Sequence, residues 1–488
     1  MSARRGLAAG ALLITALCTP ASAVPGGDCR LTATDEFIYS YSTFSQREIV
    51  ENWLDATLQQ GGLRAGVLLD HQAPSEEGFR ANAVRHRFVA LAKPGLDLRV
   101  GHFYGMFGRG LLFAAREDRR LRVDTALDGV IASGRRGPWQ GTVFSGTPSA
   151  LSVDVRGADA EIGLGEHWTL GASGLTWRAD DGVRADGSVR REWVTAPRLT
   201  ATLPFGGAYL EYGWKKGWDA VPVPDDAFQG GHAFYGSVQL FHGPLALVAE
   251  AKDYRRFTVL RAVDGRTPLN EPPALTREHL YTLLNRAPHA VNADDERGQH
   301  VELTWTGTAG WSALLDGSRT GRHDGTRTFE EAYAQLEQER IGAFRLRGAL
   351  GYRESEGLRQ SAVAEVSWLL DSHRSLTLQA EHQHVRMGGG FGFDLGAYDE
   401  EYLKLECDMT PAWSATTILE FNDKYAAQRA FGERAGPFPA AQLAYTNSDG
   451  ARISLWAGRR QAGYLCAGGV CKYEPAFEGM ELAGTVRY

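Results

Sequence analysis

Charged side chains are concentrated in a glycine-rich stretch, residues 101–128, which reads GHFYGMFGRGLLFAAREDRRLRVDTALD. Its glycines suggest that this backbone packs closely against neighbouring structure. Charges of both signs at a narrow point can select ions, and this is the chemistry that these residues could provide. A salt-bridged packing element would need the same residue types, so both interpretations stay open. The candidate constriction residues are Arg109, Arg116, Glu117, Asp118, Arg119, Asp124 and Asp128.

Patterns for metal binding and catalysis are weak. His382 and His384 share one strand face beside Glu381, but a histidine pair of this kind is usually incidental. The acidic run 294–296 lacks the spaced Asp/Asn–Gly loop that calcium sites use. The sequence contains no G-x-S-x-G elbow, Walker loop or H-E-x-x-H motif. We therefore expect no catalytic, cofactor-binding or metal-binding residue, and no enzyme.

A second long stretch, residues 258–299, carries side chains that a simple connector would not need. Loops longer than about 15 residues are usually functional or disordered, and apolar residues such as Tyr281 and Leu283 argue against disorder. We expect a short helix near 276–285, capped by Thr276, within a plug or lid.

The elements that position these stretches follow from an alternation of polar and apolar residues with period two. In the run YLKLECDM at 402–409, four apolar residues occupy one face, and Tyr, Lys, Glu and Asp occupy the other. The alternation resumes after the turn 410–412 and recurs over most of the chain. Such a pattern predicts strands with one apolar and one polar face.

The alternating runs come in pairs that flank tight turns rich in Gly, Pro, Asn and Asp, as hairpins do. The turns are Gln60–Gly62, Lys93–Gly95, Arg136–Pro138, Leu164–Glu166, Phe205–Gly207, His242–Pro244, Thr308–Gly310, Arg340–Gly342, Asp371–His373, Thr410–Ala412 and Ser448–Gly450. Eleven hairpins, with further strands near 33–42 and 476–488, give about 24 strands (range 18–26). Bacterial outer-membrane barrels have even strand counts, and lipid requires a closed sheet. We predict an all-β, transmembrane, antiparallel up-and-down barrel over 33–488, with inward-folded loops.

The N-terminus carries an export signal. Arg4 and Arg5 precede the apolar stretch 7–17, and Ala21–Ala23 forms an A-x-A cleavage site. A lipoprotein signal at Cys18 is the alternative, but the leucine before that cysteine is too large. We therefore expect a signal peptide over 1–23 and a short segment over 24–32 before the barrel.

The composition excludes several other classes of protein. The chain has 488 residues, 43% of them hydrophobic and 23% charged, unlike a collagen, a coiled coil or a disordered chain. A mean hydropathy of −0.29 excludes a bundle of membrane helices. The net charge is −7 and the basic residues are scattered, so we expect no nucleic-acid partner.

Four cysteines follow the export signal. Cys466 and Cys471 enclose the short turn Ala-Gly-Gly-Val, and an oxidising compartment favours a disulfide between them. A metal site would need further ligands, and no histidine lies near. Cys29 and Cys407 have no obvious partner.

The C-terminal strand ends in Tyr488, with apolar residues such as Met480 and Leu482 on the same face. This pattern resembles the signal read by the outer-membrane barrel-assembly machinery. A chain that begins and ends on the periplasmic side has all eleven tight turns there. Segments 258–299 and 462–475 should then lie outside the cell.

Several motifs in combination resemble a bacterial outer-membrane barrel family of unknown function. They are GHFYGMFGRGL at 101–111, EDR at 117–119, LDG at 127–129, REHLYTLLNR at 277–286 and CAGGVCKYEPAFEG at 466–479. The resemblance implies the fold and the location, and it implies no activity.

These features favour a porin-like channel or conduit for an unidentified solute or partner segment. Its other expected partners are outer-membrane lipid and the assembly machinery. We expect residues 105–127 to fold inward, anchored by Leu111–Phe113, and to form the main constriction. A surface scaffold or adhesin that displays long loops is the alternative. An outer-membrane enzyme is less favoured, and a TonB-coupled receptor would need a large plug domain where strand alternation already begins, soon after Cys29.

Overall fold

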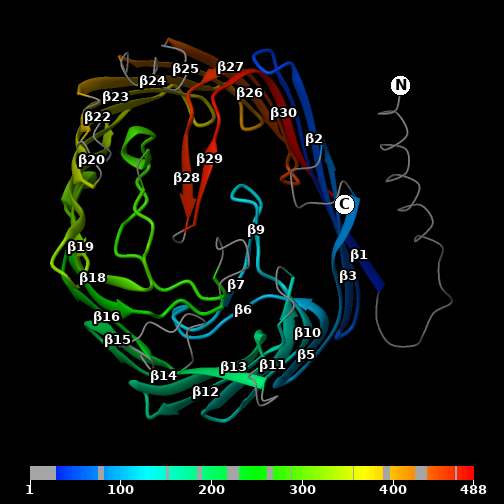
Figure 1. Cartoon of the computed structure of the whole chain (residues 1–488). Coiled ribbons are helices and arrows are strands. Elements are labelled where there is room, and N and C mark those ends of the chain that lie inside the picture. The colour runs from blue at the N-terminus through cyan, green and yellow to red at the C-terminus, as the bar shows by residue number, and fades with distance from the viewer. Residues whose placement is uncertain are drawn as a thin grey trace.

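The computed structural model describes residues 29–74, 82–149, 153–183, 189–216, 230–260, 268–286, 288–355, 357–387, 396–423, 437–467 and 470–488. In these residues 24 strands form one antiparallel sheet. β1 (Cys29–Ser42) pairs with β30 (Phe477–Arg487), with Ile38 opposite Ala483, and this pairing closes the sheet into a barrel (Figure 1). The predicted 24-stranded antiparallel barrel is confirmed. The predicted signal peptide lies outside the described residues.

The other wall strands follow one another around the barrel in chain order. They are β2 (Arg47–Gln60), β3 (Leu63–Ala73), β4 (Asn82–Lys93), β5 (Leu96–Phe103), β10 (Leu127–Arg136), β11 (Trp139–Pro148), β12 (Val155–Leu164), β13 (Trp168–Val183), β14 (Val189–Leu203), β15 (Gly206–Lys216), β16 (Gly231–His242), β17 (Leu245–Arg255), β18 (Asp295–Thr306), β19 (Trp311–Gly321), β20 (Arg327–Ile341), β21 (Phe344–Glu354), β22 (Gly357–Leu369), β23 (Ser375–Met387), β24 (Ala397–Asp408), β25 (Trp413–Asn422), β26 (Phe438–Thr446) and β27 (Arg452–Arg460).

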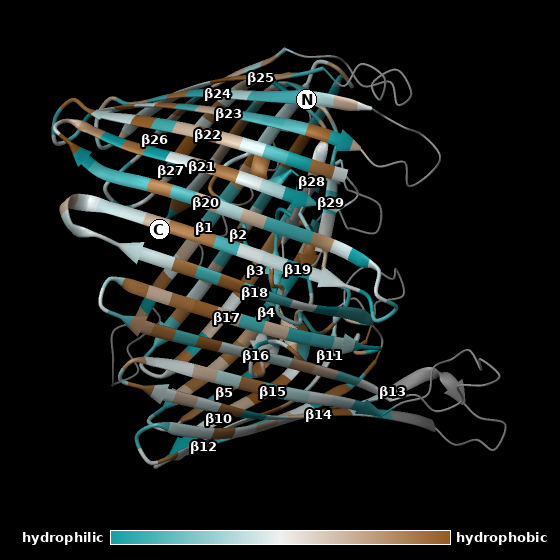
Figure 2. Cartoon of the chain, turned by 90° about the vertical axis from the view of Figure 1, so that its left-hand side faces the viewer, coloured by the Kyte–Doolittle hydropathy of each residue, from teal (hydrophilic) through white to brown (hydrophobic). Residues whose placement is uncertain are grey.

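All eleven predicted tight turns connect neighbouring wall strands, and they line one end of the barrel (Figure 2). Two are shifted slightly, because β15 already begins at Gly206 and β20 continues to Ile341. Gly61 and Gly137 adopt φ angles of 56° and 58°, which glycine reaches without a steric penalty. The longer connections gather at the opposite end.

The wall has an apolar outer face and a polar inner face, as alternation requires. On β20, Phe329, Glu331 and Tyr333 point into the lumen and are at most 5% exposed, whereas Leu336 is 49% exposed on the outer face. Figure 2 shows hydrophobic and hydrophilic residues alternating along the strands. No helix among the described residues is long and apolar enough to cross a membrane.

Three segments turn from the wall into the lumen (Figure 1). The first follows β5, the second joins β17 to β18, and the third is a hairpin between β27 and β30. We had expected segments 258–299 and 462–475 to project outside. Both leave the wall at the end that carries the long connections, but their described residues bend into the lumen (Figure 1). In the first of them, Asn270 and Leu283 find polar partners there, the Leu111 carbonyl and the Glu381 carboxylate.

Candidate functional site in the lumen

The first lumen segment, residues 104–126, contains two small hairpins. β6 (Gly105–Met106) pairs with β7 (Ala114–Ala115), and β8 (Glu117–Asp118) pairs with β9 (Val123–Asp124). The segment therefore holds a defined conformation inside the barrel.

An apolar cluster anchors this segment to the wall. Leu111, Leu112 and Phe113 are fully buried, and the Phe113 ring stacks on Phe144 of β11 with centroids 4.6 Å apart. Other members of the cluster, from the wall and from the second segment, are Val155, Leu175, Trp177, Val194, Tyr254, Phe257, Val259 and Leu269. The predicted inward fold, with Leu111–Phe113 as its anchor, is thus what the structure contains.

Two glycines allow the first segment to approach its neighbours closely. Gly108 has φ +54°, and a Cβ there would lie 2.7 Å from a Glu211 carboxylate oxygen and 2.8 Å from the Tyr209 hydroxyl. Gly110 has φ +82°, and a Cβ would lie 2.7 Å from the carbonyl oxygen of Glu271. Larger residues would push the segment away from the wall and from the second segment.

Arginines of the first segment reach across to the strands near the barrel seam. Arg119 Nη1 lies 2.6 Å from Glu36 Oε2 on β1, and Arg122 forms an ion pair with Glu51 on β2. Both guanidinium groups lie over the Trp53 ring, 5.6 and 5.7 Å from its centroid, within the range of cation–π attraction. The segment is therefore fixed to two sides of the lumen.

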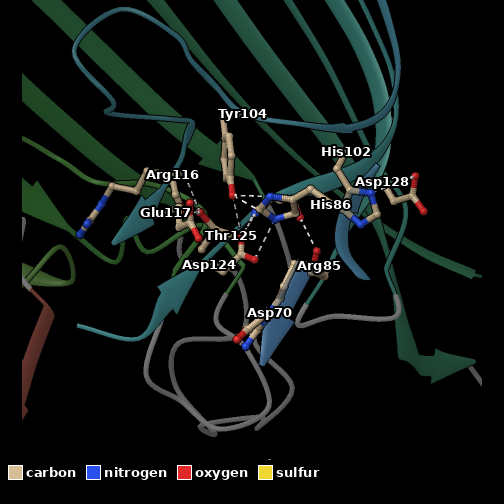
Figure 3. A network of polar contacts seen from close by, with 12 residues as sticks. Asp70, Arg85, His86, His102, Tyr104, Arg116, Glu117, Asp124, Thr125 and Asp128 are labelled. Carbon is tan, nitrogen blue, oxygen red and sulfur yellow. Dashed lines mark hydrogen bonds and ion pairs between the residues drawn. The ribbon is translucent and has the colours of Figure 1, made fainter. Parts of the chain in front are cut away.

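The root of the segment is closed by a polar clasp of Tyr104, Asp124 and the wall residue His86 (Figure 3). Asp124 Oδ2 lies 3.0 Å from His86 Nε2, and the Tyr104 hydroxyl donates to Asp124 Oδ1 at 3.2 Å. Burial alone would raise the pKa of Asp124, but its bonds with His86, the Ala126 N–H and Tyr104 lower it. Burial and the charge of Asp124 raise the pKa of Tyr104, so its hydroxyl keeps the proton. The clasp joins the two ends of the segment.

Other predicted constriction residues form ion pairs within the lumen. Arg116 pairs with Glu271 of the second segment, and its Nη1 lies 3.8 Å from Asp118 Oδ2. Glu117 Oε1 lies 3.1 Å from Arg119 Nε. Charges of both signs are thus held next to one another.

Arg109 and Asp128 occupy different surroundings from the rest of the predicted set. Arg109 is exposed and lies over the Tyr209 ring, 5.1 Å from its centroid. Asp128 follows the lumen-facing Leu127 in β10, so it faces outward, with Oδ2 3.6 Å from Arg87 Nη2. The structure therefore brings six of the seven candidates together in the lumen segment and places Asp128 on the other side of the wall.

The second lumen segment, residues 256–294, packs directly against the first. The side chain of Asn270 is buried and donates to the carbonyl oxygens of Leu111 and Phe257, both at 3.0 Å. Its Oδ1 accepts the N–H of Val259 at 2.8 Å. One buried amide thus joins the two segments.

Residues 276–286, which we call the strap, continue along the lumen wall. The expected helix is wrong, because only a 3-10 turn at Leu283–Asn285 forms and Thr276 caps nothing helical. Instead, the N–H groups of Thr282 and Leu283 donate to the Glu381 carboxylate at 3.0 and 2.8 Å. A wall side chain takes the place of the carbonyl acceptors of a helix.

Two side chains of the strap, Arg277 and His279, meet carboxylates of the wall. Arg277 forms an ion pair with Glu250 of β17, and His279 Nε2 lies 3.0 Å from Glu331 Oε1 of β20. Both glutamates are largely buried, so each needs a nearby donor or cation. The motif residues that carried the family resemblance are therefore contact residues.

Arg286 makes the last of these contacts. Its Nη1 lies 2.9 Å from Glu400 Oε2 of β24, and its Nη2 lies 2.7 Å from Glu420 Oε2 of β25. Burial lowers the pKa of this guanidinium, but the two carboxylates raise it above its ordinary value. Arg286 is therefore a permanent cation placed between two acids.

A buried histidine of the wall has the surroundings of a possible metal ligand. His300 Nε2 lies 2.5 Å from Asp316 Oδ2, and Nδ1 lies 2.8 Å from Glu250 Oε2. His300, Glu302 and Asp316 each present a ligand-type atom within 4.8 Å of the others. The register of β18 and β19, which sets Glu302 opposite Asp316, creates this group, and sequence spacing alone does not reveal it.

The weaker metal patterns of the sequence do not converge. His382 and His384 point outward, whereas Glu381 points into the lumen. His382 Nδ1 lies 2.7 Å from Glu401 Oε1, and His384 Nδ1 lies 2.8 Å from Asp399 Oδ1. The acidic run 294–296 also divides among separate partners, since Asp294 bonds to Thr258, Asp295 to His323 and Glu296 to Lys252.

The third lumen segment is the hairpin of β28 (Gly463–Ala467) and β29 (Val470–Glu474), seen across the lumen in Figure 1. Its register sets Cys466 opposite Cys471, but the side chains of both lie outside the described residues. Their disulfide stays a prediction. Cys29 and Cys407 are free thiols.

Sequence reasoning missed the wall partners of the lumen segments. Alternation does place Glu400 in phase with Tyr402, hence on the inner face. Nothing in a strand's own sequence reveals the height at which a loop from another part of the chain will meet it. For this reason His86, Glu381 and Glu400 were not found.

Comparison with known proteins agrees with this architecture. No curated protein matches the sequence. A model described as "Family of unknown function (DUF6029)" matches residues 31–315 and 352–488. The chain belongs to this family. The DUF6029 match includes the first lumen segment and the strap, and the expected likeness to a family of unknown function is confirmed.

Solved structures resemble the DUF6029 chain in fold. The P pilus usher (PapC) translocation pore aligns with a TM-score of 0.50 at 10% identity, covering 94% of this chain and 99% of that one. The outer membrane protein OpdK from Pseudomonas aeruginosa has a TM-score of 0.38 at 14% identity, covering 73% and 98%. At such identities the usher pore supports the barrel fold alone.

Proposed function

We propose that this DUF6029 barrel is an outer-membrane channel, without a catalytic step, for an unidentified solute or partner segment. The observation that carries the proposal is the way the lumen is filled. Charged wall residues line it, and the strap attaches to them through ion pairs and hydrogen bonds that water and ions can replace. Apolar clusters fix other parts of the filling, but these polar contacts are ones that a hydrated solute or ion can exchange.

Planar-bilayer recording of the purified full-length protein tests this function. Deletion of residues 106–122 removes the first lumen segment together with its contact to Asn270, so we expect a larger single-channel conductance. A variant shortened in the connection 322–326, between β19 and β20, serves as the control. Resistance of the unheated barrel to SDS shows that each variant has assembled. If the assembled deletion variant conducts no better than the wild type, a surface scaffold becomes the better explanation.

We further propose that the barrel-assembly machinery recognises the C-terminal strand. The backbone N–H of Tyr488 donates to the Ala33 carbonyl at 2.8 Å, which places this residue at the seam. Its side chain is 64% exposed, on the same outer face as Met480 and Leu482. An exposed apolar row at the seam supports contact with the machinery and then with lipid. Tyr488→Ser should slow the insertion of the barrel into the outer membrane of growing cells.

A further inference from the structure

Carboxylates from seven wall strands gather along one side of the lumen. We call this row the acidic track. Its members are Glu250, Glu302, Asp316, Glu331, Glu381, Glu400 and Glu420. Glu331, Glu381 and Glu400 are at most 4% exposed, so little water screens them. Buried acids on neighbouring strands are costly unless cations or hydrogen-bond donors compensate their charges.

The strap supplies much of that compensation. Arg277 lies at one end of the track beside Glu250, with Nε 3.8 Å from Glu302 Oε2. Arg286 lies at the other end, between Glu400 and Glu420. Between them, His279 and two backbone N–H groups occupy the middle. The strap thus places one guanidinium group at each end of the track and neutral donors between them.

The wall itself compensates the track only in part. Arg353 binds Glu331, and His300 contacts both Glu250 and Asp316. Even with the strap in place, Glu331 Oε2 and Asp316 Oδ1 are buried without a hydrogen-bond partner. These two acceptors point to a site that can take more positive charge than the chain provides.

We propose that the strap is a resident competitor for cationic solutes: a polyvalent organic cation entering the lumen binds the acidic track in place of Arg277 and Arg286, and the channel opens on that side as the strap is displaced. The inference rests on the proposed channel function and assigns its substrate class. It follows from the match between the strap's positive groups and the carboxylates they cover.

The test uses purified full-length protein in planar bilayers under a potassium chloride gradient. The variant Arg277→Gln/Arg286→Gln weakens both ends of the strap, and Arg374→Gln is the matched control, because Arg374 pairs with Asp371 in a turn far from the track. We expect the double variant to conduct at least about twofold more current and to shift the reversal potential toward potassium, with the control unchanged. Spermidine is the cationic probe and citrate the anionic one. In the wild type, spermidine should raise the current as it displaces the strap. In the double variant, where the strap is already loosened, spermidine should occupy the uncovered track and reduce the current, and adding Glu400→Gln/Glu420→Gln should abolish this block.

The outcomes separate the two claims. No current from any assembled protein would remove the channel function itself. Current that prefers chloride, or that citrate blocks and spermidine does not, would overturn the acidic track while leaving the channel intact. If the quadruple variant fails to resist SDS before heating, Glu381→Gln in the double variant replaces it, with weaker spermidine block as the expected result.

Discussion

Asp124 keeps its charge in a buried corner because three groups face its carboxylate. Its pKa is lowered from 3.8, so its charge stabilises the folded state above about pH 3.8, and this contribution is lost as the pH falls through the folded pKa. Asp124→Asn should therefore cost about 1–3 kcal/mol at neutral pH. The cost should shrink as the pH falls below 3.8 toward the lowered pKa of the folded state, where the wild-type carboxyl also takes up a proton.

Thermal unfolding of the detergent-solubilised barrel, followed by circular dichroism at both pH values, checks this. Asp128→Asn is a matched control, since it makes the same change four positions away on the outer face. Equal effects of the two substitutions, or a cost for Asp124→Asn that does not depend on pH, would contradict the role of the clasp.

Arg286 is the strap residue whose loss should cost most. Arg286→Ala leaves the buried Glu400 and Glu420 without their shared cation, at a cost of about 3 kcal/mol. That free energy corresponds to about a hundredfold faster hydrogen exchange at the strap amides of Thr282 and Leu283. Mass spectrometry of exchange in the intact barrel measures it. Arg374→Ala, at an exposed ion pair, should leave the same amides unchanged.

At the scale of elements, alternation and turn chemistry were sufficient to predict the wall strands and their turns. They were sufficient because successive side chains of a strand point to opposite faces, so its own sequence shows which face is apolar. For the strap, by contrast, the local sequence predicted the wrong structure. Its sequence, TREHLYTLLNR, contains good helix formers, yet Glu381 satisfies the N–H groups that a helix would need, and that partner lies about a hundred positions away.

The charged residues of the first lumen segment could likewise be predicted, but their partners could not. Leu111–Phe113 indicated an anchor because three adjacent apolar residues are costly to expose. Arg119 was a visible candidate, whereas Glu36 on β1 was only one of many inward acids. Whether Arg119 meets Glu36 depends on how deep the segment lies in the barrel. That depth is set by the packing of all the side chains in the lumen.

The hairpin of β28 and β29 carries a prediction about oxidation. Cys466 and Cys471 face each other in register, and the export signal predicted at residues 1–23 directs the chain to an oxidising compartment, so we expect them to be bonded. Closing so short a loop should add about 2 kcal/mol at most in the chain-entropy model. Mass spectrometry of unreduced peptides checks the bond, and two free thiols would disprove it.

At the scale of the whole molecule, the asymmetry of the barrel's two ends predicts its orientation. The end with short turns should face the periplasm. In a background without the native cysteines, Asp324→Cys, between β19 and β20, should react with an impermeant maleimide on intact cells. Glu166→Cys, in the turn after β12, should react only after the cells are broken. The reverse pattern would invert the orientation.

The long reach of the strap also has a consequence for biogenesis. The strap leaves the wall between β17 and β18, but its partners include Glu381, 98 positions from Leu283, and Glu420, 134 positions from Arg286. It cannot complete its docking until β25 has joined the sheet, and contacts of such separation form slowly. We therefore expect each new copy to pass through an assembly stage in which the wall is in place and the lumen is not yet filled. A strap with weakened ends would prolong that stage, and the cell would register the defect first as a loss of its permeability barrier, before any loss of the barrel itself.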